Sequence, residues 1–157
     1  EKIKASIDKA LDSNDIILLS GGVSAGKKDL IPGVLAEAGF ETVFHKISQK
    51  PGRPLLVATR PDGKVVFAFP GNPISTLTCF WVYFLPWVSG EWPEYNLKEI
   101  KFLPKPSAEL DQWIPVENGE VLAHNGSGDL INWSRADGLV WQKAGQKDTK
   151  LPYIPLK

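Results

Sequence analysis

Glycines and lysines between an apolar run and a helix-like pattern form the stretch of this sequence best suited to chemistry. The segment Ser20-Gly-Gly-Val-Ser-Ala-Gly-Lys-Lys-Asp29 follows the apolar block Ile16 to Leu19. Gly21, Gly22 and Gly26 let the backbone turn tightly and approach a ligand closely, because glycine has no Cβ. A strand that ends in such a turn at a helix start directs backbone N–H groups and the positive end of the helix dipole into one space. The stretch therefore predicts a site for a phosphate or another oxyanion.

Two further cations are candidates to hold the same anion. Residues 42–48 alternate as a strand does, which places Lys46 on one face, and a continued extended chain would place Lys50 there too. Two ammonium groups on one strand face beside an anion loop could clamp a polyanionic ligand. Solvated lysines on an exposed edge strand account for the spacing equally well, so both interpretations stay open. We predict that His45, on the opposite face, is a hydrogen-bonded structural residue.

A second strand-to-helix turn occurs at Pro70-Gly-Asn-Pro-Ile-Ser75. Asn72 has the chemistry of a helix N-cap and Pro73 that of the first helical residue, a pairing that starts a helix at a fixed point. The apolar pattern that follows predicts a helix over residues 74–88. With the first glycine turn, this gives two turns that present backbone donors to one ligand.

The elements that must position these residues alternate between helix and strand. Apolar spacing predicts a first helix over residues 1–12, a strand at Ile16 to Leu19 buried on both faces, a second helix capped by Asp29 and closed by Gly39, and the strand 42–48. This order is typical of βαβ packing, with the ligand crevice beyond the C-terminal ends of the strands. Residues 55–59 and 65–69 flank a hairpin turn, so the sheet is predicted to be mixed.

After residue 92 the pattern changes to short strands separated by turn residues. Asn118-Gly119 predicts a hairpin turn. The spacing indicates a small β-barrel or sandwich module, and the polar stretch from Ser127 to Arg135 is interpreted as a connection between strands. The candidate strands are 99–103, 113–117, 120–124, 138–142 and 150–154.

Composition excludes several classes of protein. The chain has 157 residues, of which 43% are hydrophobic, and 18 basic side chains balance 18 acidic ones. Nothing in this balance indicates a nucleic-acid partner, and no apolar run reaches the roughly 18 residues of a membrane span. The single cysteine excludes an internal disulfide and fits a reducing, cytoplasmic setting. Because methionine is absent even at the first position, we expect the chain to be the C-terminal part of a longer protein.

A phosphate-loop nucleotide-binding protein is one alternative. Gly21, four residues and Gly26-Lys27 nearly spell the motif of the NTPases, at the correct place between strand and helix. Position 28 is Lys, however, where that motif needs a hydroxyl group to hold Mg²⁺. A plain strand-turn-helix connection, in which the glycines only make the turn, is the other alternative.

Three motifs together resemble the molybdopterin molybdenumtransferases, the MoeA-type family that includes the gephyrin E domain and its plant relatives. They are the Ser20 to Asp29 loop, the Lys46 to Pro54 segment with its Lys-Pro-Gly-Arg-Pro ending, and the Pro70 to Ser75 turn, in this order. Residues 125–139 look like the C-terminal β-barrel domain of the same proteins. The Ser-Gly-Gly loop alone would also suggest the related adenylyltransferases or the CinA-like proteins.

The resemblance implies a fold and a reaction. The fold would be α/β: the C-terminal half of a three-layer α/β/α molybdopterin-binding domain with a mixed sheet at residues 1–92, then a small all-β barrel domain at 93–157. The reaction would transfer molybdate onto the dithiolene of adenylylated molybdopterin, with Mg²⁺ and with release of AMP. The full-length protein would be a homodimer, and residues 1–157 alone would be inactive or severely weakened. A non-catalytic scaffold of the gephyrin type is the alternative from another functional class.

The resemblance also assigns roles to residues. Asp29, Lys46 and Lys50 match the functional aspartate and lysines of the family, and Asp29 would contact the metal. Arg53 stands where the family usually has Lys, which keeps the charge but replaces a point donor by a planar fork. The substrate-binding residues implied are Ser20, Gly21, Gly22, Ser24, Gly26, Arg53, Pro70, Gly71, Asn72, Pro73 and Ser75.

Overall fold

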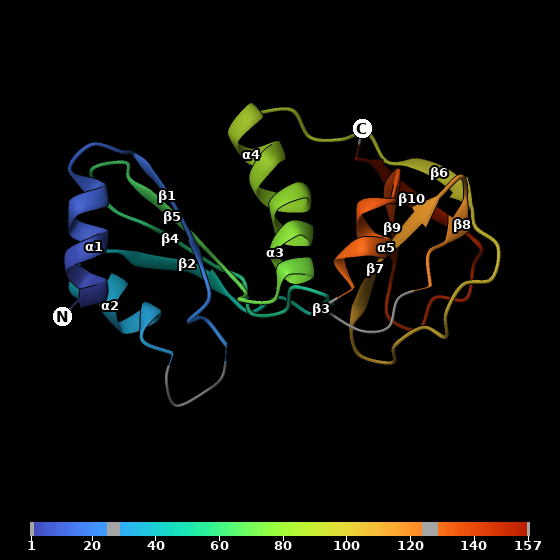
Figure 1. The fold of residues 1–157 in the computed structure, drawn as a ribbon, viewed down its shortest axis with the longest axis horizontal. Coiled ribbons are helices and arrows are strands. Elements are labelled where there is room, and N and C mark those ends of the chain that lie inside the picture. Colours follow the sequence, from blue (N-terminus) through green and yellow to red (C-terminus); the bar gives the residue numbers. More distant parts are fainter. Residues whose placement is uncertain (1, 25–28, 124–128, 157) are drawn as a thin grey trace. The chain divides into compact units, whose positions relative to one another are not determined.

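The computed structural model describes residues 2–24, 29–123 and 129–156 (Figure 1). The chain packs as two compact units, which we treat separately. The first unit comprises residues 1–47 and 52–71, and the second comprises residues 48–51 and 72–157. Among the described residues, no helix is long and apolar enough to cross a membrane.

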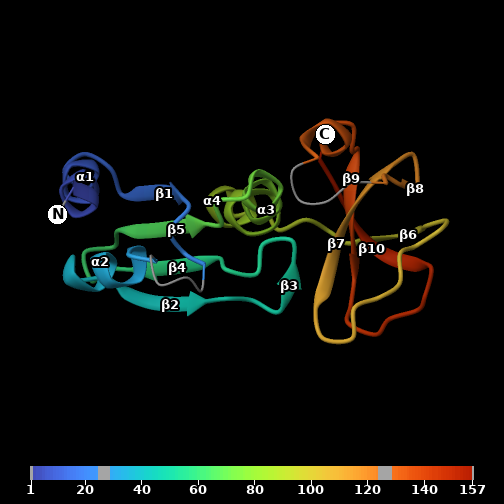
Figure 2. The same cartoon turned by 60° about the horizontal axis from the view of Figure 1, so that its bottom comes forward.

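The first unit is an α/β structure with a mixed four-stranded sheet of order β1-β5-β4-β2 (Figure 2). Strand β5 pairs in parallel with β1 and antiparallel with β4, and β2 pairs antiparallel with β4. The prediction of a mixed sheet is therefore confirmed. The elements are α1 (Lys2–Leu11), β1 (Ile16–Ser20), α2 (Ile31–Glu37), β2 (Glu41–His45), β4 (Leu56–Thr59) and β5 (Val65–Phe69).

Helices α1 and α2 share one hydrophobic core with alternate residues of the sheet, including Ile17 of β1. The residues on either side of it, Ile16 and Leu18, are 37% and 44% exposed. The prediction that this strand is buried on both faces was wrong. Side chains alternate between the two faces of a strand, so Ile16 and Leu18 point away from the helices against which Ile17 packs.

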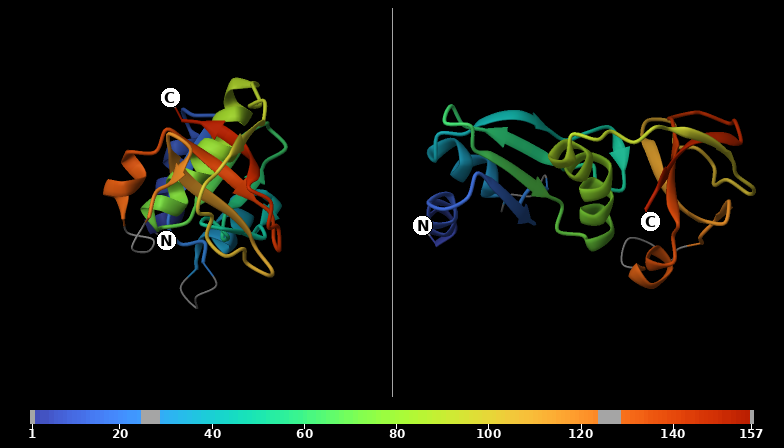
Figure 3. Two further views of the ribbon diagram at one scale, coloured as in Figure 1. Left: turned by 90° about the vertical axis from the view of Figure 1, so that its right-hand side faces the viewer. Right: turned by 90° about the horizontal axis from the view of Figure 1, so that it is seen from above.

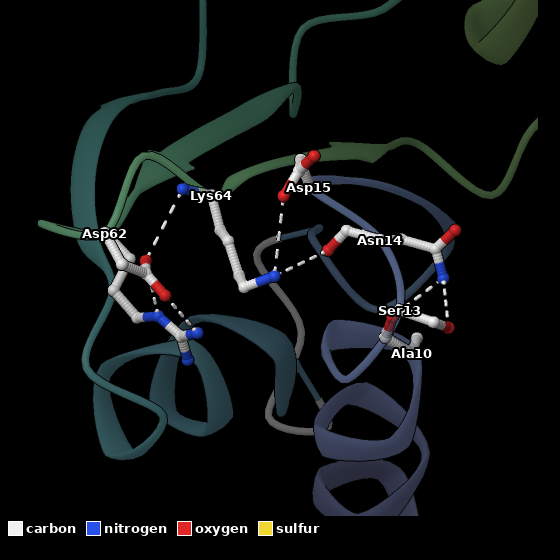
Figure 4. A network of polar contacts seen from close by, with 7 residues as sticks. Ala10, Ser13, Asn14, Asp15, Asp62 and Lys64 are labelled. Atoms are coloured by element: carbon white, nitrogen blue, oxygen red, sulfur yellow. Dashed lines mark hydrogen bonds and ion pairs between the residues drawn. The ribbon is translucent and has the colours of Figure 1, made fainter.

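Lys64 joins the hairpin turn to the start of β1 (Figure 4). Its ammonium group donates to the carbonyl oxygen of Asn14 at 3.0 Å and lies 3.6 Å from a carboxylate oxygen of Asp15. The Asn14 side chain donates in turn to the carbonyl oxygen of Ala10 in α1, at 2.8 Å. These contacts tie the end of α1 to the start of β5, so the two parallel strands begin in a fixed register.

The second unit begins with a helical segment made of α3 (Pro73–Cys79), the π-helical turn η1 (Phe80–Phe84) and α4 (Leu85–Ser89). The Asn72 side chain accepts from the backbone N–H of Ser75, at 3.2 Å, and Pro73 is the first helical residue. The predicted cap is therefore confirmed. Within η1 the N–H of Leu85 reaches back to the carbonyl of Phe80, five residues earlier. This wide turn changes which side chains face the rest of the unit.

The β part of this unit is an open sheet of order β3-β7-β9-β10-β6, with β8 paired to β7 (Figure 3). A sheet of short strands is confirmed, but the module is not all-β, and no barrel closes among the residues that the structure describes. A short helix, α5 (Leu130–Ser134), precedes β9. The strands are β3 (Gln49–Lys50), β6 (Asn96–Glu99), β7 (Asp111–Glu117), β8 (Glu120–Val121), β9 (Gly138–Gln142) and β10 (Lys150–Pro155).

Two details of this module bear on the sequence predictions. Asn118 and Gly119 have φ values of 53° and 81°, which confirms the hairpin turn between β7 and β8. The strand expected at residues 99–103 was wrong, because β6 ends at Glu99. Phe102 has a φ of 56° and is 90% exposed, so the chain has left the sheet there.

The Arg60–Asp62 pair in the hairpin turn generates a prediction about pH. The guanidinium donates to both carboxylate oxygens, at 2.9 and 2.7 Å, and lowers the pKa of Asp62 to about 2. Since the folded-state pKa is depressed, the stabilising contact is present above the ordinary Asp range and is lost as the pH falls toward 2. A carboxyl-carbon NMR titration should show this low midpoint, and the variant Arg60→Gln should return it toward 4. Equal midpoints in both proteins would contradict the contact.

Candidate functional site

Most of the predicted site residues of the first unit lie where the strands of the four-stranded sheet end, here called the sheet edge. Strands β1, β5 and β2 run in the same direction, because β1 is parallel to β5 while β5 and β2 both pair antiparallel with β4. Their C-terminal ends therefore lie at one edge, together with the N-terminal end of β4. The residues that follow these ends, or precede β4, are Gly21, Lys46, Arg53 and Gly71. Ligands of α/β proteins bind at such an edge.

The two glycine turns meet at this edge. The N–H of Gly21 donates to the carbonyl oxygen of Phe69 at 2.9 Å. A Cβ added to Gly71 would lie 3.3 Å from the Cα of Gly21, so the two backbones pass too closely for a side chain to fit easily between them. Gly21 and Gly22 have φ values of 94° and 72°, in the left-handed region that favours glycine. The structure thus brings together two turns that lie fifty residues apart in the sequence.

Local contacts hold the first turn in place. Val23 is buried at 1% exposure, and its carbonyl oxygen lies 3.0 Å from Nε2 of His45. This contact confirms that His45 is a hydrogen-bonded structural residue, which links the loop after β1 to the end of β2. Ser20, Gly22 and Ser24 are exposed around the buried Val23. The loop therefore has an anchored centre with polar groups open to solvent on either side.

Asp29 does not cap the second helix. The N-cap of α2 is Leu30, which makes no side-chain capping hydrogen bond, and Pro32 lies in the first turn. The predicted cap was wrong because the helix begins one residue later than its apolar pattern suggested. Asp29 is half-buried just before α2. Gly26, Lys27 and Lys28, on which the phosphate-loop alternative depends, lie outside the described residues.

The two lysines do not follow one another on a continuous strand. Strand β2 ends at His45, and Lys46 has a φ of 70°, which interrupts the extended conformation. Lys50 belongs to β3, in the other sheet. The prediction that Lys46 and Lys50 share a strand face was therefore wrong. A left-handed conformation costs a non-glycine residue about 1–2 kcal/mol, so the surrounding contacts must hold Lys46 in this geometry.

Those contacts come from the segment before β4. The N–H of Lys46 donates to the carbonyl oxygen of Leu55 at 2.9 Å, and the N–H of Ile47 donates to that of Arg53 at 2.8 Å. Both cationic side chains, Lys46 and Arg53, are exposed. The first unit therefore presents two cations and two glycine turns at one sheet edge, an arrangement suited to a multiply charged anion.

The second unit brings Lys50 and Ser75 together at a pocket of about 570 Å³. Lys50 is exposed, whereas Ser75 is 9% exposed behind the capped start of α3. Pro51 and Gln112 also contribute to the wall. The rest of the lining is largely apolar: Ile74, Pro104, Trp113, Ile114, Val121, Leu122, Ala123 and Trp133. A pocket with apolar walls and a few polar groups is the usual form of a small-molecule site.

The apolar part of this pocket was missed by sequence reasoning. Trp113 lies in β7, a strand that is buried on both faces, so no alternation indicated which side chains line a cavity. Trp133 comes from α5, in a stretch that was interpreted as a polar connection. The structure instead places this short helix there, and its N-cap Asp129 accepts from the N–H of Asn132 at 3.3 Å.

A metal centre built from protein side chains alone is absent from the described part of the chain. No group of three or more His, Cys, Asp or Glu side chains in this part of the chain could hold a metal ion. A single carboxylate such as Asp29 still fits Mg²⁺, which proteins commonly hold through one or two carboxylates together with substrate phosphates and water. The metal contact of Asp29 stays a prediction.

Comparison with known proteins identifies relatives of this chain. A family model described as "Probable molybdopterin binding domain" matches residues 1–90. A molybdopterin molybdenumtransferase from Synechocystis sp. is 33% identical over 131 residues, which is 80% of this chain and 33% of that protein. The molybdenum cofactor synthesis protein cinnamon of Drosophila melanogaster is 36% identical over 86 residues, 55% of this chain and 14% of that protein.

A solved structure extends the likeness over almost the whole chain. The molybdopterin biosynthesis moeA protein from Pyrococcus horikosii matches with a TM-score of 0.74 and 28% identity. The match covers 97% of this chain and 39% of that chain. The chain thus spans well under half the length of each of these three proteins.

The glycine turn generates a stability prediction with a control in the next helix. Gly22→Ala should destabilise the fold by about 1–2 kcal/mol, because alanine must adopt a positive φ. The new Cβ would also lie 2.8 Å from Cγ1 of Ile31. Gly33→Ala, in α2 with open space around its Cβ, should stabilise by about 0.5–1 kcal/mol. Urea unfolding of both variants measures the difference, and equal changes would contradict the strained turn.

Proposed function

The chain belongs to the family of molybdopterin-binding domains, and from this premise we propose that it is part of a molybdopterin molybdenumtransferase. Such an enzyme transfers molybdate onto the dithiolene of adenylylated molybdopterin and releases AMP. The observation that carries the proposal is the sheet edge where the turns at Gly21 and Gly71 meet beside Lys46 and Arg53. The names of the relatives support the same reaction.

The predicted site residues of the first unit's sheet edge, and those of the second unit, would supply two kinds of contact to the substrate. Backbone N–H groups of the glycine turns, other than that of Gly21, which donates to Phe69, would bind the phosphate oxygens of the pterin substrate, since glycine allows the closest approach of a backbone. Lys46, Lys50 and Arg53 would offset the negative charge of molybdate and of the phosphate link as that link breaks. Ser20, Ser24, Asn72 and Ser75 would orient the substrate through hydrogen bonds. Pro70 and Pro73 would keep the second turn in one shape.

Mg²⁺ fits this site as a metal held mainly by the substrate. Asp29 would be its ligand from the described residues, with phosphate oxygens and water completing the shell. When bound, Mg²⁺ would neutralise charge on the phosphate link. The half-buried position of Asp29, directly before α2 and after the glycine loop, supports this role.

The proposal includes the organisation and setting of the protein. We place the molybdopterin-binding part at residues 1–92 and a C-terminal β module at 93–157, a division supported by the family match to residues 1–90. We also propose a homodimeric full-length protein in the cytoplasm. Burial raises the pKa of the single cysteine, Cys79, to about 12, so its thiol stays protonated and suits a structural role in a reducing setting.

Replacing Lys50 tests the function directly. In the longer protein that contains these residues, Lys50→Ala should lower the rate of molybdate transfer about 100-fold, because one charge aimed at the transition state is lost. The control is Lys147→Ala, which removes an exposed lysine from a loop that does not line the pocket. The assay measures formation of molybdenum-loaded cofactor and of AMP. Unchanged transfer by Lys50→Ala would remove Lys50 from the site.

Replacing Asp29 tests the metal contact. Asp29→Asn should raise the Mg²⁺ concentration needed for half-maximal transfer about tenfold or more, since the substituted amide is a weaker ligand than a carboxylate. Asp148→Asn, an exposed residue between β9 and β10, is the matched control. The same Mg²⁺ dependence in both variants would show that Asp29 does not hold the metal.

A further inference from the structure

A buried amide lies directly beside Lys50. Gln49 is 3% exposed, and its side-chain oxygen accepts two hydrogen bonds, one from the hydroxyl of Tyr83 and one from Nε1 of Trp113, the latter at 3.0 Å. Its side-chain nitrogen donates to the carbonyl oxygen of Pro51 at 2.9 Å. Both acceptor positions and one of the two donor positions of the amide are therefore used.

The three partners come from separate parts of the second unit. Tyr83 lies in the π-helical turn η1, Trp113 lies in β7, and Pro51 follows β3. Burial raises the pKa of Tyr83, so its hydroxyl is protonated and can donate a hydrogen bond at neutral pH. Trp113 is held from a second side by Trp141, whose ring lies nearly parallel at 5.9 Å between centroids. The amide is thus fixed by rigid neighbours.

The amide holds the chain on both sides of Lys50. Gln49 precedes Lys50, and the Pro51 carbonyl that accepts its hydrogen bond follows Lys50. The backbone of β3 pairs with β7 at the same place, with Lys50 opposite Gln112. A side chain that only filled the core would need no hydrogen bond across the neighbouring residue. This arrangement instead fixes the direction in which the Lys50 backbone presents its side chain.

Lys50 and Trp113 both line the 570 Å³ pocket that also contains Ser75. The same indole that donates to Gln49 therefore forms part of the pocket wall. From this geometry we propose that Gln49 is a positioning residue, which together with Tyr83 and Trp113 holds the Lys50 ammonium at the pocket for an oxyanion. The proposal rests on the proposed function, because it takes Lys50 to be an anion-binding residue.

The test measures molybdate binding by calorimetry, in the longer protein that contains these residues. Tyr83→Phe keeps the ring and removes one hydrogen bond to Gln49, and it should weaken binding about fivefold. Gln49→Leu should weaken it further, because two buried donors lose their acceptor. The matched control is Tyr153→Phe, which removes a hydroxyl bound to Asp137 in the same unit but outside the pocket, and should leave binding unchanged.

Tyr83→Phe in a protein that lacks the Lys50 side chain separates the positioning of Lys50 from a general effect on stability. If Gln49 acts through Lys50, Tyr83→Phe should have no further effect on molybdate binding in a protein that already carries Lys50→Ala. The same loss with and without Lys50 would overturn the proposal, since it would show that the hydroxyl acts only on the fold. Thermal melting of each variant confirms that the compared proteins are folded.

Different measurements would contradict the proposed function and the positioning role of Gln49. Equal molybdate binding by the natural chain and by Lys50→Ala would contradict the anion-binding role of Lys50. Hydrogen exchange at the Lys50 amide would then decide the positioning part on its own, with exchange in Tyr83→Phe expected to be about fivefold faster than in the natural chain. Unchanged exchange in Tyr83→Phe would overturn the positioning role.

Discussion

The parallel pairing of β1 with β5 is the constraint on which the candidate site depends. Because these strands run in the same direction and in register, Ser20 lies opposite Phe69 and both chains leave the sheet at the same edge. The backbones at Gly21 and Gly71 then pass so closely that a Cβ on Gly71 would lie 3.3 Å from the Cα of Gly21. An antiparallel pairing would place one of these turns at the opposite edge, about 15 Å away for a five-residue strand. The contacts of Lys64 with the end of α1 fix where this pairing begins.

Different physical means position the polar groups of the two candidate regions, the sheet edge of the first unit and the pocket of the second. In the first unit the backbone does most of the positioning, through glycine turns, the left-handed conformation of Lys46 and the hydrogen bonds of Lys46 and Ile47 to the segment before β4. In the second unit a buried side chain does it, because Gln49 connects β3 to η1 and β7. Backbone positioning survives most substitutions other than those of glycine. Positioning by a buried amide depends on the identity of three side chains, so it is the more easily changed by mutation.

The sequence predicted those features whose causes are local. The cap at Asn72, the first-turn Pro73 and the hairpin turn at Asn118-Gly119 follow from the conformations that these residues favour, and the structure confirms them. Prediction from the sequence failed where a contact between residues far apart in the chain decides the local conformation. A periodic strand pattern continues through Lys46, yet hydrogen bonds to Leu55 and Arg53 turn the chain there. Tyr83 and Trp113 follow Gln49 in the chain by 34 and 64 residues, and nothing in their local sequence indicates that they contact it.

The burial of Gln49 is informative because an apolar residue would satisfy packing alone. A buried amide costs free energy unless its hydrogen bonds are made, and the energy gained from making them is modest. Unlike leucine, such an amide constrains the orientation of its neighbours, because its donors and acceptors fit only one arrangement of their partners. The π-helical turn has a similar effect, because its wider winding sets the angle at which Tyr83 leaves the helix. Both features converge on the peptide that carries Lys50, which places directional hydrogen bonds next to the exposed cation found among the described residues that line the pocket.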